Sequence, residues 1–190
     1  EINANKRKSL FLISIFILVI AALGYFTGWY LNLGYGPLTI AVIISLIFSL
    51  VSFYSGDKIA LAMSGAKEIQ PQDNPYVWRL IENLTITAGL PMPRVYIIND
   101  SALNAFATGR DPQHASIALT SGIIEALENE ELEGVIAHEL SHIKNYDIRV
   151  MMVAIICVGA ITLLSDWIMR NMMWGRRSRS DRDNTGGILI

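Results

Sequence analysis

Two long runs without a charged residue constrain this chain more than any other feature. The first extends from Ser9 to Leu33 and the second from Pro37 to Tyr54. At 1.5 Å rise per residue, a helix over the first run is long enough to cross a hydrocarbon core of about 30 Å. The sequence therefore predicts two transmembrane helices, at 9–33 and 37–54, and a chain that is not fully soluble.

The link between the two runs, Asn32 to Gly36, is short, so we expect a helical hairpin with both outer ends on one side. Lys6, Arg7 and Lys8 precede the first helix, and basic flanks favour the cytoplasmic side. A secretory signal peptide is disfavoured because its apolar stretch is only about 7 to 15 residues. These features predict a cytoplasmic basic tail at 1–8 and a cytoplasmic domain after the hairpin.

The charge distribution supports a water-facing domain next to the hairpin. The chain is 52% hydrophobic and 17% charged with a net charge of −2, so no bulk basic attraction to nucleic acid is expected. Residues 55–149 hold seven Lys or Arg and 13 Asp or Glu, a local net charge of −6. We therefore expect an acidic domain over 55–149 with the lipid bilayer as a partner of its flanks. The single cysteine, Cys157, excludes an internal disulfide and a cysteine-based zinc knuckle.

The middle domain has the pattern of an α-rich α+β fold. Asn74 and Pro75 predict a helix start, and Gly89 predicts its end. Three short runs have strand character, at 95–98, 102–108 and 116–120. The last two flank a turn-like stretch and could pair as a hairpin. Helical packing faces follow from Ser121, with five acidic residues on the side expected to face water.

The sequence His138-Glu139-Leu140-Ser141-His142 is the main candidate for chemistry. In a helix, residues four apart share one face, so both imidazoles can bind one ion while Glu139 reaches its open side. This spacing predicts a zinc site with His138 and His142 as ligands. The structural alternative is two helix-face histidines and one more surface acid.

The zinc interpretation assigns a role to each residue of the motif. A catalytic zinc usually has three protein ligands and one open position, and it lowers the pKa of its water toward about 7. Glu139 would take the water proton and pass it to the leaving amine. The expected chemistry is peptide hydrolysis without a covalent intermediate.

Two further residues are candidates for the site. Asp147 could accept a hydrogen bond from a ligand imidazole and orient it, or it could pair with Lys144 or Arg149 at the surface. His114 stands alone in the predicted hairpin loop, which favours an ordinary surface residue.

A third apolar segment follows the motif, with cleanly apolar residues from Val150 to Leu164. It is shorter than the roughly 17 to 25 residues of a usual span, so the helix at 150–168 is predicted either to cross or to lie against the membrane. If the motif helix continues unbroken into this segment, His142 lies about eight residues, or roughly 12 Å, from its start. Residues 169–190 are predicted as a basic loop and the start of a further apolar segment.

The stretch Asn104-Ala105-Phe106-Ala107, the run from Ser121 to Asp147 and the two apolar helices resemble the HtpX family of bacterial membrane proteases and the related CAAX prenyl proteases. The resemblance covers essentially the whole chain. It implies a zincin-like metalloprotease domain with a small β-sheet, anchored as a multi-pass protein in the bacterial cytoplasmic (inner) membrane.

The resemblance also implies a function and a substrate site. The family members are zinc endopeptidases that help to clear misfolded membrane proteins, with membrane-proximal polypeptides as substrates. Asn104, Ala105 and Phe106 match the strand thought to lie beside the substrate. Two alternatives stay open: a prenyl-protein protease, and a pseudoprotease that holds unfolded chains without cleaving them.

The chain departs from the family pattern at the third zinc ligand. The family takes this ligand from a downstream glutamate, yet no glutamate follows Glu139 here. The chain also begins without Met and stops in what looks like the opening of an apolar helix. We therefore expect a C-terminally truncated chain with its third ligand beyond residue 190, which binds one zinc ion weakly and cleaves poorly.

Overall fold

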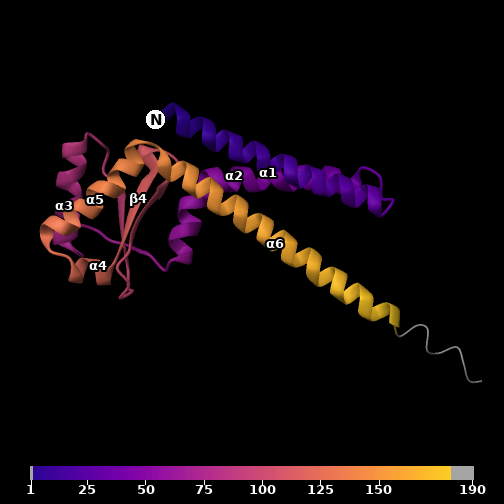
Figure 1. The fold of residues 1–190 in the computed structure, drawn as a ribbon. Coiled ribbons are helices and arrows are strands. Elements are labelled where there is room, and N and C mark those ends of the chain that lie inside the picture. Colours follow the sequence, from indigo (N-terminus) through magenta and orange to yellow (C-terminus); the bar gives the residue numbers. More distant parts are fainter. Residues whose placement is uncertain (1, 181–190) are drawn as a thin grey trace, which may run out of the picture.

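A helical hairpin projects from a small α+β domain (Figure 1). The computed structural model describes residues 2–180. Helix α1 spans Ile2–Tyr30 and helix α2 spans Gly36–Met63, and the two run side by side with the N-terminus next to the domain. Both helices are long and apolar enough to cross a membrane.

Both hairpin helices are longer than the uncharged runs. Within the predicted basic tail at 1–8, residues 2–8 form the first turns of α1, and α2 continues past Tyr54 to Met63. The end of an uncharged run shows only where the first charged residue stands. A helix ends where the backbone leaves the helical conformation. For α2 that point is Gly65, whose φ of +67° is left-handed, next to a bond from the Ala66 N–H to the Leu61 carbonyl.

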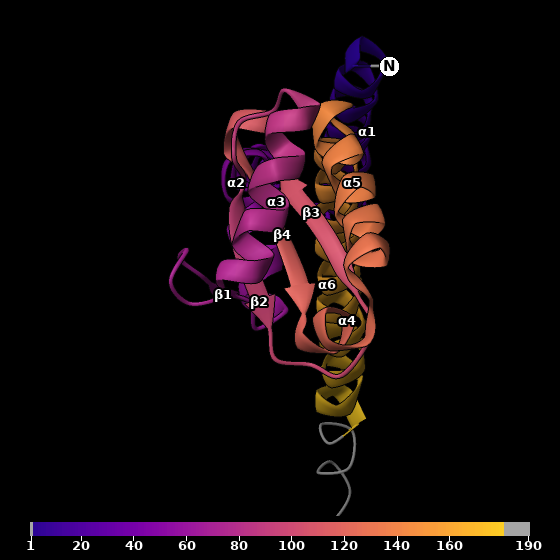
Figure 2. The ribbon, with the colours of Figure 1, turned by 90° about the vertical axis from the view of Figure 1, so that its left-hand side faces the viewer.

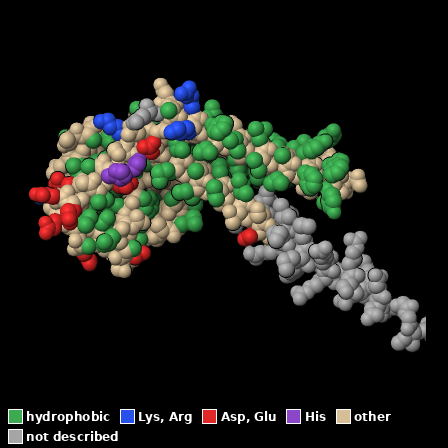
Figure 3. Space-filling model, in the orientation of Figure 1, with side chains coloured by type: hydrophobic (Ala, Val, Ile, Leu, Met, Phe, Trp, Pro, Cys, Tyr) green, Lys and Arg blue, Asp and Glu red, His purple; other side chains and the backbone are tan. Residues whose placement is uncertain are grey.

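Small residues let the two hairpin helices approach closely. A Cβ added at Gly24 would collide with Ala41 and with the carbonyl of Pro37, and one at Gly28 would collide with the carbonyl of Gly34. Large apolar side chains instead cover the outer surface of the hairpin, as the green surface in Figure 3 shows. This is the packing expected of helices in lipid.

The domain contains a four-stranded mixed sheet in the order β1-β2-β4-β3. Its strands are β1 (Lys67–Glu68), β2 (Arg94–Ile98), β3 (Ala105–Gly109) and β4 (Ala115–Thr120). Strand β4 is antiparallel to β3 and parallel to β2. The pairing of β3 with β4 agrees with the predicted hairpin, although β3 begins three residues later than 102. The two-residue β1 was not predicted, because it is too short to carry a periodic pattern.

Helices α3 (Pro75–Ala88), α4 (Ser121–Ala126) and α5 (Asn129–Lys144) cover one face of the sheet (Figure 2). The predicted start near Asn74 and Pro75 and the predicted end at Gly89 are confirmed. Asn74 caps α3 by accepting the Val77 N–H at 3.1 Å, and Gly89 ends it in a left-handed conformation. The opposite face, with Tyr96, Ile98 and Ala118, packs against Leu61 near the end of α2. The sheet is therefore held between the domain helices and the membrane hairpin.

The helix that carries the motif does not continue into the third apolar segment. Helix α5 ends at Lys144, and α6 (Asp147–Ser180) starts after a bend of 81°. Tyr146 at the bend has a φ of +63°, a conformation that non-glycine residues adopt rarely. The unbroken helix considered from the sequence is wrong, and with it the estimate of 12 Å between His142 and the apolar segment.

The described part of the chain is an α-rich α+β membrane protein with an N-terminal helical hairpin, as predicted. Two helices qualify as spans, or three if the bent pair α5 and α6 counts as one. That the helix at 150–168 crosses the membrane or lies against it stays a prediction. Of the predicted basic segment at 169–190, residues 181–190 lie outside the described residues.

Candidate active site

Helix α5 presents its apolar face to the core and its motif to the surface. Leu132, Ile136, Leu140 and Ile143 are all buried against the sheet and α3. Glu128 and Glu131 form a capping box at the helix start. The sequence interpretation placed both acids on a solvated face and missed this role, although a pair of acids three residues apart before an apolar run could have indicated it.

The two motif histidines face one another across one turn of α5. Their Nε2 atoms are 3.1 Å apart and their rings meet edge to face. Two nitrogens bound to one tetrahedral zinc, each at about 2.0–2.1 Å, are separated by roughly 3.3 Å. The spacing of His138 and His142 therefore fits a shared zinc ion. Figure 3 shows the purple histidine side chains gathered on the open surface of the domain.

Asp147 lies behind the second histidine. Its Oδ2 is 3.1 Å from Nδ1 of His142. The two neighbouring cations are engaged elsewhere: Lys144 donates to the Ala88 carbonyl, and Arg149 lies over the Phe53 ring. The geometry thus matches the first of the two roles considered for Asp147. A carboxylate at Nδ1 is on the far side of the ring from Nε2, so Asp147 is not placed to be the third ligand.

Two nitrogens do not complete a protein zinc site, which usually has three protein ligands when it is catalytic. Within residues 2–180, as far as they are described, no group of three or more His, Cys, Asp or Glu side chains is arranged to hold a metal ion. His138 and His142 can therefore supply two of the usual three protein ligands of a catalytic zinc. The identity of the third ligand stays a prediction.

Glu139 is tied to the edge of the sheet. Its Oε2 accepts the backbone N–H of Ala107 at 2.9 Å. In an antiparallel pair, successive residues point their N–H groups alternately toward and away from the partner strand. Ala107 therefore turns its N–H away from β4, and this bond places the carboxylate beside the outer edge of β3.

The predicted substrate residues lie at the start of this same edge strand, but they differ in which backbone and side-chain groups are already used in contacts. The Asn104 carbonyl accepts the Thr120 N–H at 3.0 Å, so that part of its backbone is used by β4. The Phe106 side chain packs against Tyr96, Ile98 and Ala118. Ala105 alternates with Phe106 and shares the outward backbone orientation of Ala107. The substrate role of all three residues remains a prediction.

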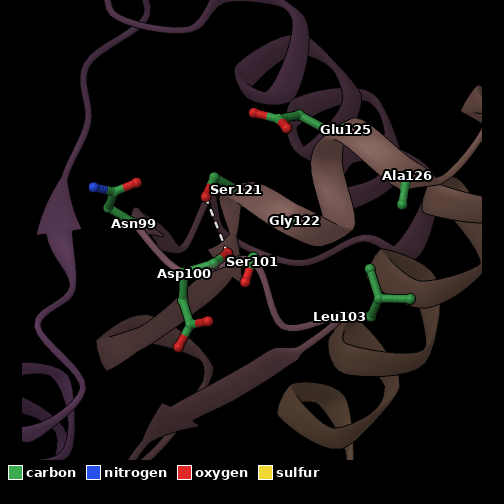
Figure 4. Close-up of a pocket in the computed structure, with 8 residues that line it drawn as sticks. All are labelled: Asn99, Asp100, Ser101, Leu103, Ser121, Gly122, Glu125 and Ala126. Atoms are coloured by element: carbon green, nitrogen blue, oxygen red, sulfur yellow. Dashed lines mark hydrogen bonds between the residues drawn. The ribbon is translucent and has the colours of Figure 1, made fainter.

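The other candidates lie apart from the motif. His114 is exposed, and its Nδ1 lies 2.7 Å from Oδ1 of Asp111. Burial of the Asp111 carboxyl raises its pKa, but the hydrogen bonds and charge of His114 have the larger combined effect, so the pKa of Asp111 is lowered. Ser141 donates locally to the His138 carbonyl. A pocket of about 500 Å³ lies between the loop after β2 and helix α4, with Asp100, Ser121 and Glu125 in its wall (Figure 4). None of its lining residues belongs to the predicted site.

Residues 71–187 match peptidase family M48. The chain belongs to this family. The M48 match spans the whole sheet from β2 onward and the complete motif helix. It agrees with the resemblance drawn from Ser121 to Asp147 and makes the chain a member of a protease family.

Similarity to several curated relatives covers the hairpin as well as the domain. A protein named "Protease HtpX homolog" from Tropheryma whipplei (strain Twist) is 43% identical over 189 residues, which cover 100% of this chain and 64% of that protein. Proteins of the same name from Streptococcus pneumoniae (strain Hungary19A-6) and Thermoanaerobacter pseudethanolicus are 45% and 40% identical, over 92% and 98% of this chain. The chain spans 58% to 64% of the length of these three relatives.

Proposed function

We propose that this chain provides the membrane anchor and the HExxH half of a zinc-dependent endopeptidase that hydrolyses misfolded or damaged membrane proteins. The observation that carries the proposal is the arrangement on α5: two imidazole Nε2 atoms 3.1 Å apart and, between them in sequence, a carboxylate held at the outer edge of strand β3. Membership in family M48 and the similarity to proteins named HtpX homologues support it.

His138 and His142 are proposed to hold the metal through Nε2. When bound, zinc would polarise the scissile carbonyl and lower the pKa of a water molecule. The bond between Nδ1 of His142 and Asp147 keeps the proton on that nitrogen, which leaves Nε2 with a lone pair to donate.

Glu139 is proposed as the general base and acid. A carboxylate in this position accepts a proton from the attacking water and returns it to the leaving amine nitrogen. The bond from the Ala107 N–H holds one carboxylate oxygen and limits its rotation. The proton-transfer group is thereby attached to the strand along which a substrate would lie.

An extended substrate is proposed to pair with the outer edge of β3. Main-chain hydrogen bonds to such an edge depend little on the substrate sequence, which suits the removal of many different damaged chains. The backbone groups of Ala105 and Ala107 point toward this edge, where Glu139 holds the Ala107 N–H. Because the hairpin packs against the other face of the sheet, substrates in or near the bilayer are favoured. We place the domain in the cytoplasm, at the bacterial inner membrane.

The substitution Glu139→Gln tests this mechanism. It keeps the shape of the side chain and its bond to Ala107 but removes the base, so cleavage of an unfolded, membrane-tethered polypeptide by the full-length protein should fall about 10²- to 10⁴-fold. Glu130→Gln is the matched control, because Glu130 is an exposed acid on the same helix. Unchanged turnover in the Glu139 variant would show that the mechanism is wrong.

The same experiment separates the alternatives. An endopeptidase requires that Glu139→Gln still captures the polypeptide without cutting it. A pseudoprotease requires that the unsubstituted protein also captures it without cutting. A prenyl-protein protease requires cleavage of a lipidated C-terminal peptide and none of its unlipidated counterpart.

A further inference from the structure

Asn5, in the second turn of α1, is the point where the membrane hairpin contacts the motif. The residue is 6% exposed although it lies near the end of its helix. Helix α1 has 29 residues, about 43 Å by helical rise, so it exceeds a hydrocarbon core of about 30 Å. Its first turns therefore reach beyond the lipid and pack against the bend between α5 and α6.

Both ends of the Asn5 amide are engaged. Its Oδ1 accepts from Nζ of Lys8 at 3.2 Å, and its Nδ2 donates to the backbone carbonyl of Asn145 at 3.0 Å and to Oδ1 of Asp147. The neighbouring Lys6 lies over the ring of Tyr146, 4.6 Å from its centroid. Two successive residues of α1 thus contact three successive residues at the bend.

The contacts form one chain of hydrogen bonds from α1 to the histidine pair. Asp147 uses Oδ1 for Asn5 and Oδ2 for Nδ1 of His142, and Nε2 of His142 faces Nε2 of His138. Asp147 is about one third exposed, so without a second partner its carboxylate could turn toward water. An amide donor restrains it and leaves its negative charge in place, whereas a lysine would neutralise that charge.

We propose that Asn5 is a positioning residue, which sets the orientation of His142 through Asp147 and so makes the metal site depend on the docking of α1. This inference rests on the proposed function, because it assumes that His142 binds zinc. It assigns to the membrane helix a part in building the site, in addition to anchoring the domain.

The test measures zinc affinity by chelator competition and the absorption bands of bound Co²⁺, using the full-length protein in detergent. Asp147→Ala should weaken zinc binding about 10- to 100-fold, as outer-shell partners usually do, and Asn5→Leu should weaken it roughly tenfold and shift the cobalt bands. In the double variant, Asn5→Leu should add less than about twofold, because the two residues act in one chain.

Ser9→Ala is the matched control. Ser9 is fully buried one turn further along the same helix face, and its hydroxyl donates to the carbonyl of Asn5, so its loss should leave zinc affinity and cobalt bands unchanged. If Asn5→Leu fails to fold, Asn5→Asp replaces it, since it keeps the size but loses the donor. A tenfold loss that persists in the Asp147→Ala background would overturn the proposal, as would unaltered zinc affinity and cobalt bands in Asn5→Leu.

His142→Ala separates this inference from the proposed function. If that variant keeps the zinc affinity of the unsubstituted protein, the zinc site itself is wrong. If His142→Ala loses zinc and Asn5→Leu does not, the zinc site stands and only the role of Asn5 fails.

Discussion

The membrane hairpin buries more small and polar residues than the domain does, next to a few large apolar ones such as Phe16 and Ile20. Within α1 and α2 the buried positions include small and polar residues: Ser9, Gly24, Gly28, Ser45, Ser49, Ser52 and Gly56. Large apolar residues of the hairpin such as Leu46 and Ile47 are about half exposed. In the domain the pattern is reversed, because Ile81, Ile117, Leu132 and Ile136 are fully buried.

The difference shows that one chain is adapted to two solvents. In lipid, apolar side chains gain little by turning inward, so close packing of small residues holds helices together. A buried hydroxyl can then bond its own helix, as Ser49 does with the Ser45 carbonyl at 2.7 Å. In water, removing apolar surface from solvent is the main stabilising term, so the domain needs a core of branched side chains.

The largest effect that distinguishes the two regions is expected from truncating the core. Ile136→Ala in α5 should lower the free energy of unfolding of the domain by about 2–5 kcal/mol, because it leaves a cavity among fully buried neighbours. Leu46→Ala, at a 48% exposed position of α2, should change it by less than about 0.5 kcal/mol. Thermal unfolding in detergent measures both. Equal losses in the free energy of unfolding would mean that the hairpin, like the domain, is stabilised by a core of large apolar side chains.

A residue too large for the hairpin interface should have the next largest effect. Gly24→Leu places a side chain against Ala41 and the Pro37 carbonyl, and overpacking of this kind costs about 1–3 kcal/mol. The expected result is a more protease-sensitive hairpin. Gly36→Ala is the control, because a Cβ there meets nothing within 4 Å. Identical protease resistance in both variants would contradict close packing at Gly24.

The smallest effect is expected at a helix cap in the domain. Asn74→Ala removes the acceptor of the Val77 N–H and should destabilise the domain by about 1 kcal/mol, because a helix end then lacks a partner. Asn83→Ala, at an exposed interior position of the same helix, should be neutral or slightly stabilising. Thermal unfolding distinguishes them. A larger loss of stability for Asn83→Ala than for Asn74→Ala would show that the Asn74 cap does not stabilise α3.

Features with a local signal were predictable from the sequence. Helix α3 carries its own start in Asn74 and Pro75 and its own stop in Gly89, and these signals depend on neighbouring residues alone. The bend between α5 and α6 has no such signal, since neither Gly nor Pro interrupts the chain there. It is supported by contacts from Asn5 and Lys6, about 140 residues earlier, and no local pattern could have indicated them.

The division into a lipid-facing and a water-facing part and the spacing of the motif both follow from the order of the residues. Uncharged runs define the hairpin, and an i, i+4 pair of histidines must share one helix face wherever the helix lies. Two contacts come from the fold: Glu139 meets Ala107, 32 residues away, and Asp147 meets Asn5, 142 residues away. Helical periodicity acts over a few residues, whereas these contacts exist because distant segments fold against each other.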